Sequence, residues 1–389
     1  MSIPARRRHP EGLGVLFAVK LTTNTAARFV YAFLPAIARG LGVSLSAAGV
    51  LASVRWVSGA ATPLALRGIG TENRRRVAAA GAGLFGIGAL VTAVAGVYAG
   101  AIVGFALMGL AKPLFDTAAQ AFVSDRVPYP RRARTVGVLE ATWALGFLVG
   151  APLAGWLIAR WGWTAPFWVT GVVGLALLIP VLRVVRDDAD VPVAAGSIRW
   201  DRASVGFLTA GALVVGSAEL IFITFAAWLE SDFGFSVTGL AALATAVGVA
   251  ELAAEAATVL VTDRLGKSRA VVVGLLVSAA AYLVVAAATT PAVVVTALIA
   301  GIAGFEFAIV SSISLGTELQ PTARMAFLAR FVVAQAAGRA VAAVGGVALF
   351  EVWGRSGVGV SAALAAVAAA LVMGVAVREH GTASPSTPR

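Results

Sequence analysis

The residues best able to do chemistry in this chain are charged side chains that stand inside long apolar runs. In "GLAKPLFDTA", residues 109–118, Lys112 and Asp116 lie four positions apart, the spacing that brings two side chains together on one helix face. Burying a charge among apolar groups is costly unless it is paired, so we expect each to face a partner or a cavity. The other charges inside apolar segments are Lys20, Arg28, Arg55, Glu140, Glu219, Glu251, Glu255, Glu306, Arg330 and Arg339.

Proton transfer is the chemistry that these residues allow. Burial raises the pKa of a carboxyl group and a nearby cation lowers it, so a carboxylate whose partner moves can bind and release a proton. The chain has no cysteine, and its only histidines, His9 and His380, lie near the two ends. Thiolate and histidine chemistry is therefore excluded from the apolar segments. Because no GxxxxGK[ST], GxSxG or HExxH motif occurs, we expect no cofactor and no metal.

The composition indicates that the apolar segments lie in a lipid bilayer. Of 389 residues, 59% are hydrophobic and only 13% are charged, whereas globular domains have roughly 25% charged residues. A helix needs about 20 mostly apolar residues to cross a membrane. The sequence predicts twelve such helices, at about 12–39, 45–67, 77–97, 98–122, 135–159, 164–184, 203–228, 237–262, 270–289, 291–316, 325–351 and 357–378.

The basic residues predict how the chain is oriented. Its net charge of +11 does not indicate nucleic-acid binding, because Lys and Arg gather in the short loops between apolar segments. Twenty-one fall on the side of the two termini, and only three fall on the other side. Because cytoplasmic loops carry the excess of Lys and Arg, we expect both termini in the cytoplasm, with the chain in the cytoplasmic (inner) membrane. Four tryptophans at outer helix ends are expected at the membrane interface: Trp161, Trp163, Trp228 and Trp353.

The chain contains two similar halves. Asp116 and Glu306 are 190 positions apart, and so are Arg134 and Arg324. Parallel six-helix repeats around a site at mid-membrane are one architecture of secondary transporters. The predicted parts are an N-terminal six-helix bundle (1–184), a cytoplasmic linker (185–202), a C-terminal six-helix bundle (203–378) and a cytoplasmic tail (379–389).

Two stretches resemble motifs of the major facilitator superfamily. "VTDRLGKSRAVVVG" is similar to that family's D-R-x-G-[RK]-x-[RK] loop, a cytoplasmic latch in which the aspartate pairs with arginines of neighbouring helices; the matching residues are Asp263, Arg264, Gly266, Lys267 and Arg269. "GFLVGAPLAG" resembles the glycine–proline motif of the drug–proton antiporter branch, and ordinary packing of small residues between helices is the alternative interpretation. The matching residues are Gly146, Gly150, Pro152 and Gly155.

The resemblance covers about 12–378 and implies an all-α integral membrane protein, with twelve transmembrane helices in two pseudo-symmetric six-helix bundles, the major facilitator fold. It also implies that the first, fourth, seventh and tenth helices line a central cavity. On that basis the candidates for the proton-coupling carboxylate are Glu219, Asp116 and Glu306, in that order. The candidate substrate contacts are Arg28, Asn24 and Tyr31 on the first helix and Lys112 on the fourth.

Each of these charges also has a static interpretation. Lys112 and Asp116 can form a permanent ion pair. Glu219 can be a fixed partner of Arg28, and Glu306 of Arg339, while Arg28 itself can serve helix packing instead of binding an anion. Structural or gating roles are expected for Arg55, Glu140, Glu251, Glu255 and Arg339.

The sequence therefore predicts a secondary transporter, not an enzyme, that moves a small organic or drug-like molecule by alternating access. Proton-coupled efflux is the favoured direction, and a proton symporter or uniporter that imports a metabolite, such as an anion, is the alternative. A membrane receptor or membrane enzyme is a remote alternative, because the loops are short and catalytic motifs are missing. The expected partners are the lipid bilayer, a small-molecule substrate and protons, with no nucleic acid, and we expect a monomer.

Overall fold

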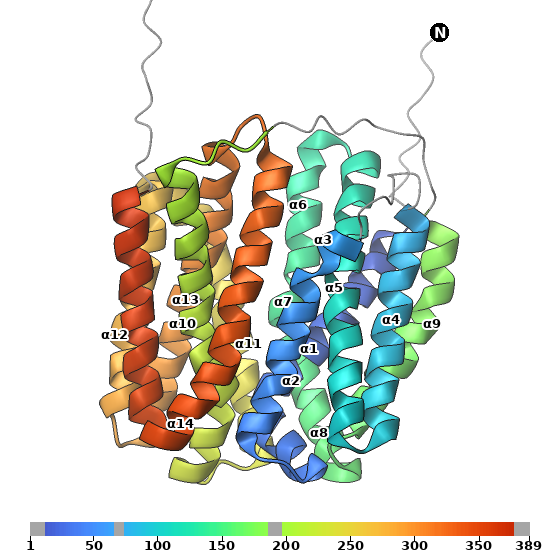
Figure 1. Cartoon of the computed structure of the whole chain (residues 1–389), viewed down its shortest axis with the longest axis vertical. Coiled ribbons are helices and arrows are strands. Elements are labelled where there is room, and N and C mark those ends of the chain that lie inside the picture. The colour runs from blue at the N-terminus through green and yellow to red at the C-terminus, as the bar shows by residue number, and fades with distance from the viewer. Residues whose placement is uncertain (1–11, 66–73, 186–196, 377–389) are drawn as a thin grey trace, which may run out of the picture. The chain divides into compact units, whose positions relative to one another are not determined.

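Helices make up the regular structure of this chain. The computed structural model describes residues 12–65, 74–185 and 197–376, and within these ranges no strand occurs (Figure 1). Nine helices in the described ranges are long and apolar enough to cross a membrane. The chain is thus a multi-pass membrane protein, as its composition predicts. The predicted tail and most of the predicted linker lie outside the described residues.

The first six predicted spans correspond closely to observed helices. The fifth span is formed by four consecutive elements, which include the π-helical turn η2, and α2 and α3 together form the second. The elements are α1 (Leu13–Leu41), α2 (Leu45–Ala60), α3 (Thr62–Ala65), α4 (Arg74–Ala95), α5 (Tyr98–Arg126), α6 (Tyr129–Glu140), α7 (Thr142–Leu145), η2 (Gly146–Gly150), α8 (Ala151–Trp161) and α9 (Ala165–Val184).

The last six predicted spans correspond to five elements. They are α10 (Arg202–Phe233), α11 (Val237–Leu265), α12 (Lys267–Ala287), α13 (Pro291–Leu319) and α14 (Arg324–Ala376). α14 is interrupted at Gly354, whose φ of 61° lies in the left-handed region that glycine adopts without steric cost. Divided there, the helices of the described residues form the twelve segments of the predicted fold class.

The described chain divides into two compact units. The first contains residues up to Val193 together with Phe225–Gly248, and the second contains Ala194–Thr224 together with the chain from Val249 onward. The end of α10 and the start of α11 therefore group with the first unit. The sharper division into bundles at 1–184 and 203–378 stays a prediction.

The same packing device occurs in both units. In the first unit, a Cβ built on Gly104 of α5 would lie 2.5 Å from the carbonyl oxygen of Gly88 on α4, so only glycine permits this approach. In the second unit, Gly304 of α13 meets Gly274 of α12 in the same way, at 2.8 Å. Thr92 Oγ1 and Ser278 Oγ each donate to the carbonyl four residues earlier, at Gly88 and Gly274. The repeat seen in the sequence thus extends to helix contacts.

The four tryptophans expected at the membrane interface differ in exposure, and Trp163 is partly buried. Trp161 and Trp353 are 59% and 63% exposed, as residues facing lipid headgroups would be. Trp228 is wholly buried within the protein. Its place near a helix end predicts depth in the membrane, but which side of the helix it occupies depends on packing that sequence position alone does not give.

Candidate functional site

Four charged side chains of the first unit form a connected cluster on helices α1, α5 and α6. Lys20 Nζ lies 2.7 Å from Glu140 Oε1 and 3.6 Å from Asp116 Oδ1. Lys112 Nζ lies 2.6 Å from Asp116 Oδ2. We call Lys20, Lys112, Asp116 and Glu140 the four-charge cluster; its two ammonium groups and two carboxylates neutralise one another.

Exposure changes steeply across this cluster. The side chain of Lys20 is 4% exposed, those of Lys112 and Asp116 are about a quarter exposed, and that of Glu140 is 52% exposed. The apolar side chains of Leu16, Val19 and Phe115 are buried beside them on the same helices. Because charges interact more strongly in such surroundings than in water, the buried end of the cluster is held more tightly than its exposed end.

The sequence explains one half of the cluster directly. Lys112 and Asp116 are one helical turn apart on α5, and their predicted pairing is observed. Pro113 stands inside α5 and lacks the N–H that would bond to the preceding turn, so the helix bends more easily at this point. Lys20 is the residue whose role sequence reasoning missed. The available signal was that a lysine is almost never fully buried without a partner.

The second unit has a buried ion pair of its own. Arg339 Nη1 on α14 donates to Glu219 Oε2 on α10 at 2.8 Å, and Glu219 is wholly buried. The sequence suggests Arg28 as a partner of Glu219 and Glu306 as a partner of Arg339. The observed hydrogen bond joins Glu219 to Arg339. Glu306 on α13 is 5% exposed. On α11, Glu251 is also buried, whereas Glu255 is half-buried.

The predicted substrate residues of α1 face two different neighbours. Arg28 is wholly buried, with its guanidinium carbon 3.5 Å from the ring centre of Phe147 on η2. Asn24 Nδ2 donates to Thr142 Oγ1 on α7 at 2.8 Å. Tyr31, by contrast, accepts a hydrogen bond from Arg55 Nη2 on α2 at 3.2 Å. The grouping of a cation, a ring and an amide on one face is therefore divided between α7–η2 and α2.

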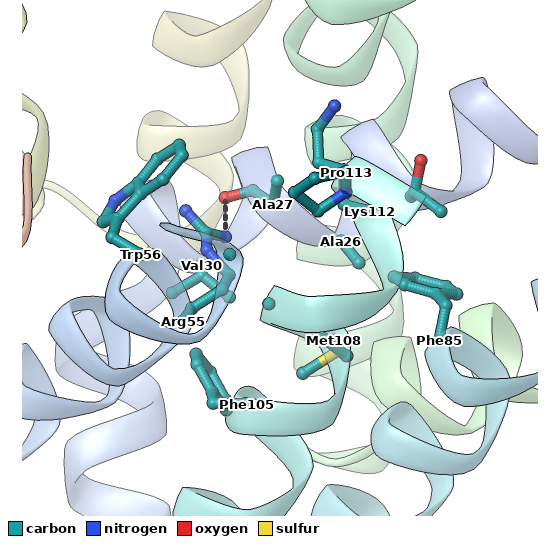
Figure 2. Close-up of a pocket in the computed structure, with 13 residues that line it drawn as sticks. Ala26, Ala27, Val30, Arg55, Trp56, Phe85, Phe105, Met108, Lys112 and Pro113 are labelled. Atoms are coloured by element: carbon teal, nitrogen blue, oxygen red, sulfur yellow. Dashed lines mark hydrogen bonds between the residues drawn. The ribbon is translucent and has the colours of Figure 1, made fainter. Parts of the chain in front are cut away.

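A cavity lies in the first unit beside Arg55. Figure 2 shows Arg55 and Trp56 together at one edge of this space and Phe85 at the opposite edge. The cavity is lined mainly by apolar side chains of α1, α2, α4 and α5, and its volume, open mouth included, is about 490 Å³. Lys112 also lines it, and in Figure 2 its amine extends away from Phe105 and Met108. The cavity and the four-charge cluster thus share one residue.

The glycine–proline motif packs against α1. A Cβ on Gly146 would lie 2.9 Å from Arg28 Cγ, and one on Gly150 would lie 2.5 Å from Thr25 Oγ1. A Cβ on Gly155 would lie 2.9 Å from Phe33 Cζ. These three glycines therefore let η2 and α8 approach α1 closely. Pro152 stands at the start of α8, just after the π-helical turn, where its missing N–H is tolerated.

The latch-like loop lies between α11 and α12. Lys267 Nζ forms an ion pair with Glu318 Oε1 at the end of α13. Gly266 has a φ of 84°, which explains the glycine at that position. Asp263 is exposed and makes no ion pair within the described parts of the chain, and Arg264 and Arg269 are exposed as well. The contact observed at this loop is therefore made by its lysine and not by its aspartate.

Metal ligands do not gather in the described ranges. No group of three or more His, Cys, Asp or Glu side chains there is placed to hold a metal ion. The chemistry that the described residues offer is ion pairing and proton binding by carboxylates, next to an apolar cavity with basic residues at its edge.

Sequence comparison connects part of the chain with known transporters. Residues 16–205 match the sequence model of the Major Facilitator Superfamily. A 92-residue segment is 37% identical to an uncharacterized MFS-type transporter, YwfA, of Bacillus subtilis (strain 168), and covers 23% of this chain and 22% of that protein. A 91-residue segment is 35% identical to a cis,cis-muconate transport protein of Acinetobacter baylyi, and covers 23% of this chain and 20% of that protein. The aligned segments thus span about a fifth of these curated relatives.

Structure comparison extends the likeness to the whole fold. The crystal structure of the peptide transporter POT in complex with sulfate superimposes with a TM-score of 0.76 over 95% of this chain and 94% of that one, at 15% sequence identity. The relatives named in these comparisons are transporters and not enzymes. Residues 16–205 are thus similar in sequence to the Major Facilitator Superfamily, and the chain as a whole has the fold of the solved transporter structures.

Proposed function

We propose that this protein is a secondary active transporter of a small organic molecule, that it works by alternating access, and that a proton gradient drives it. The observation that supports this proposal best is the four-charge cluster. It joins three helices of one unit through two carboxylates and two ammonium groups. A static protein has little use for such a group inside an apolar bundle, because well-packed apolar side chains would be at least as stable.

The cluster suggests how a proton would change helix contacts. Lys20 bridges Asp116 and Glu140, and Lys112 holds the other oxygen of Asp116. When Asp116 binds a proton it loses its charge, and both lysines lose one attractive partner. Lys20 then stays with Glu140, while Lys112 on α5 is released. Pro113 allows α5 to bend near Lys112. The release of Lys112 can therefore change the shape of α5, which also lines the cavity.

The buried pair in the second unit is the other candidate for coupling. Glu219 is wholly buried and is bonded to Arg339, so a movement that separates the two helices would break a hydrogen bond between two charged groups. Glu306, the repeat counterpart of Asp116, is the third candidate. We rank Asp116 first, because two cations and the half-exposed carboxylate of Glu140 surround it.

Efflux is the direction we propose, and uptake of an organic anion is the second candidate. Efflux rests on the likeness of the glycines of η2 and α8 to the antiporter motif. Uptake is favoured by the buried cation Arg28 and by the named muconate transporter among the relatives, since muconate is a dianion. We propose a monomer in the cytoplasmic membrane in either case.

Proton flux in membrane vesicles tests both directions. Everted vesicles with an acidic interior should lose their pH gradient when ethidium is added if the protein is a drug–proton antiporter. Right-side-out vesicles should alkalinise the medium when cis,cis-muconate is added if it is an anion–proton symporter. Vesicles without the protein give the baseline. Transport of either compound that proceeds at an equal rate with and without a proton gradient would contradict proton coupling.

The matched variants compare two ion pairs of the first unit. Asp116→Asn should abolish substrate-dependent proton flux while leaving the protein in the membrane. Glu230→Gln is the control, because Glu230 pairs with Arg39, whose side chain is 62% exposed, outside the four-charge cluster. Equal proton flux in the two variants would exclude Asp116 as the coupling residue.

A further inference from the structure

The guanidinium of Arg55 is buried without a carboxylate. Arg55 is 8% exposed, and within the described parts of the chain no Asp or Glu oxygen lies within ion-pair distance of it. Its Nη1 donates to the carbonyl of Ala27 at 3.1 Å and its Nη2 to the hydroxyl of Tyr31 at 3.2 Å, and both acceptors are neutral. Arginine has five N–H groups, so three remain after these two bonds. The protein therefore holds a full positive charge in place without neutralising it.

The backbone fixes this arginine rigidly. A Cβ on Gly109 of α5 would lie 2.2 Å from the carbonyl oxygen of Arg55, and one on Gly59 of α2 would lie 3.1 Å from the carbonyl oxygen of Gly109. α2 and α5 thus touch through their backbones at the position of Arg55. The two hydrogen bonds to α1 hold the guanidinium beside the cavity, which Arg55 lines.

The rest of the cavity suits an apolar, planar body. Trp56, Phe85, Phe105 and Met108 line it, and the Arg55 guanidinium carbon is 4.8 Å from the Trp56 ring centre (Figure 2). Small-molecule sites are mostly apolar and have few polar groups that set orientation. A cation at one edge and aromatic or thioether walls elsewhere select a ligand with an anionic group attached to an apolar, flat skeleton.

We propose that Arg55 is the anchor of the transported substrate, and that this substrate is a small organic carboxylate with an aromatic or unsaturated body. The carboxylate accepts hydrogen bonds from the free N–H groups of Arg55, and its body lies against Trp56 and Phe105. Arg28, the anchor expected from the sequence, does not line this cavity. The inference rests on the proposed transport function and names the substrate class of the same site.

Ligand binding to the purified full-length protein tests the anchor without any transport step. Benzoate is the probe, and benzamide and benzyl alcohol are its neutral matches in size and shape. Benzoate should raise the thermal midpoint of the wild type in a concentration-dependent way, because a ligand that binds the folded state stabilises it. The neutral compounds should act at least about tenfold more weakly, the difference expected for a charge-assisted hydrogen bond.

Three variants test the charge of Arg55 and the size of the cavity separately. Arg55→Gln should weaken benzoate binding by about tenfold or more and leave the response to benzyl alcohol unchanged. Ala26→Leu keeps the charge but fills the cavity, so it should reduce the response to all three compounds. Arg160→Gln, which changes an exposed arginine at the end of α8, is the control and should bind as the wild type does. If Arg55→Gln does not fold, Arg55→Lys retains the charge and should keep part of the benzoate preference.

The outcomes distinguish this inference from the proposed function. Equal responses of the wild type to benzoate and benzamide, or unchanged benzoate binding by Arg55→Gln, would overturn the anchor even if proton-coupled transport is found. Arg55-dependent binding of benzoate without any proton flux would support the anchor and contradict proton coupling.

Discussion

Lys20 Nζ lies 2.7 Å from Glu140 Oε1, although 120 positions of the chain separate the two residues. The same ammonium lies 3.6 Å from Asp116 Oδ1, so one buried lysine connects two carboxylates on different helices. The contact links α1 to both α5 and α6. The contribution of each of these residues to the free energy of unfolding can be measured.

Removing the lysine should cost more stability than removing the exposed glutamate. Lys20→Met leaves two carboxylates with a single cation, and we expect a loss of about 3 kcal/mol in the free energy of unfolding. Glu140→Gln should cost about 1 kcal/mol or less, because its side chain is half exposed and its charge is screened by water. Thermal and denaturant unfolding of the purified variants gives both values. Equal losses would mean that Lys20 is held by packing alone.

The buried pair Glu219–Arg339 should show strong coupling in a double-mutant cycle. Glu219→Gln or Arg339→Gln alone removes one member of a buried ion pair and should cost about 3–5 kcal/mol. The double variant should be less destabilised than the sum of the two single variants. Glu230→Gln supplies the matched control, with an expected cost of about 1 kcal/mol or less. Additive single costs would show that the two side chains do not interact in solution.

The glycines of η2 should be sensitive to a single methyl group. Gly150→Ala places a Cβ 2.5 Å from Thr25 Oγ1, which forces η2 away from α1, and we expect a loss of about 1–3 kcal/mol. Gly137→Ala on α6 is the control, since a Cβ there meets no atom within 4 Å. That change should be neutral or stabilise the helix by about 1 kcal/mol. Comparable thermal midpoints for the two variants would refute the close contact.

The stability that Asp201 gives to the start of α10 should fall at acidic pH. The backbone N–H of Ser204 donates to Asp201 Oδ1 at 2.8 Å and lowers the pKa of that carboxyl group from its usual 3.8. Because the folded-state pKa is the lower one, the stabilisation is complete above about pH 4 and is lost as the pH falls through the folded-state value. Asp201→Ala should therefore lower the free energy of unfolding at pH 6 by about 1 kcal/mol or less, which thermal unfolding measures. The difference from the wild type should shrink near pH 3; a constant difference would contradict the role of the charge.

The predicted orientation can be tested by cysteine labelling, because the natural chain has no cysteine. Ser236→Cys, between α10 and α11, should react with a membrane-impermeant maleimide added to intact cells. Asp190→Cys, in the connection between the halves, should react only after the membrane is opened. The reverse pattern would invert the assignment of both termini to the cytoplasm.

The class of protein and the positions of its helices could be predicted from the amino-acid sequence. Apolar length and the loop charges depend only on composition along the chain, and the bilayer fixes how long a spanning helix must be. The Lys112–Asp116 pair could also be predicted, since residues four apart on a helix are neighbours wherever the helix lies.

Which distant charges meet depends on the folding of the whole unit. Lys20 joins Asp116 and Glu140, and Arg339 joins Glu219, because of how each helix is rotated about its axis. That rotation is set by the summed packing of many side chains, including the close glycine contacts between α1 and η2. A local pattern gives a residue's depth in the membrane, but the direction in which its side chain points depends on neighbours far away in the sequence. For that reason Arg55 could be recognised as a buried charge from sequence, yet its place at the wall of a cavity became visible only in the folded unit.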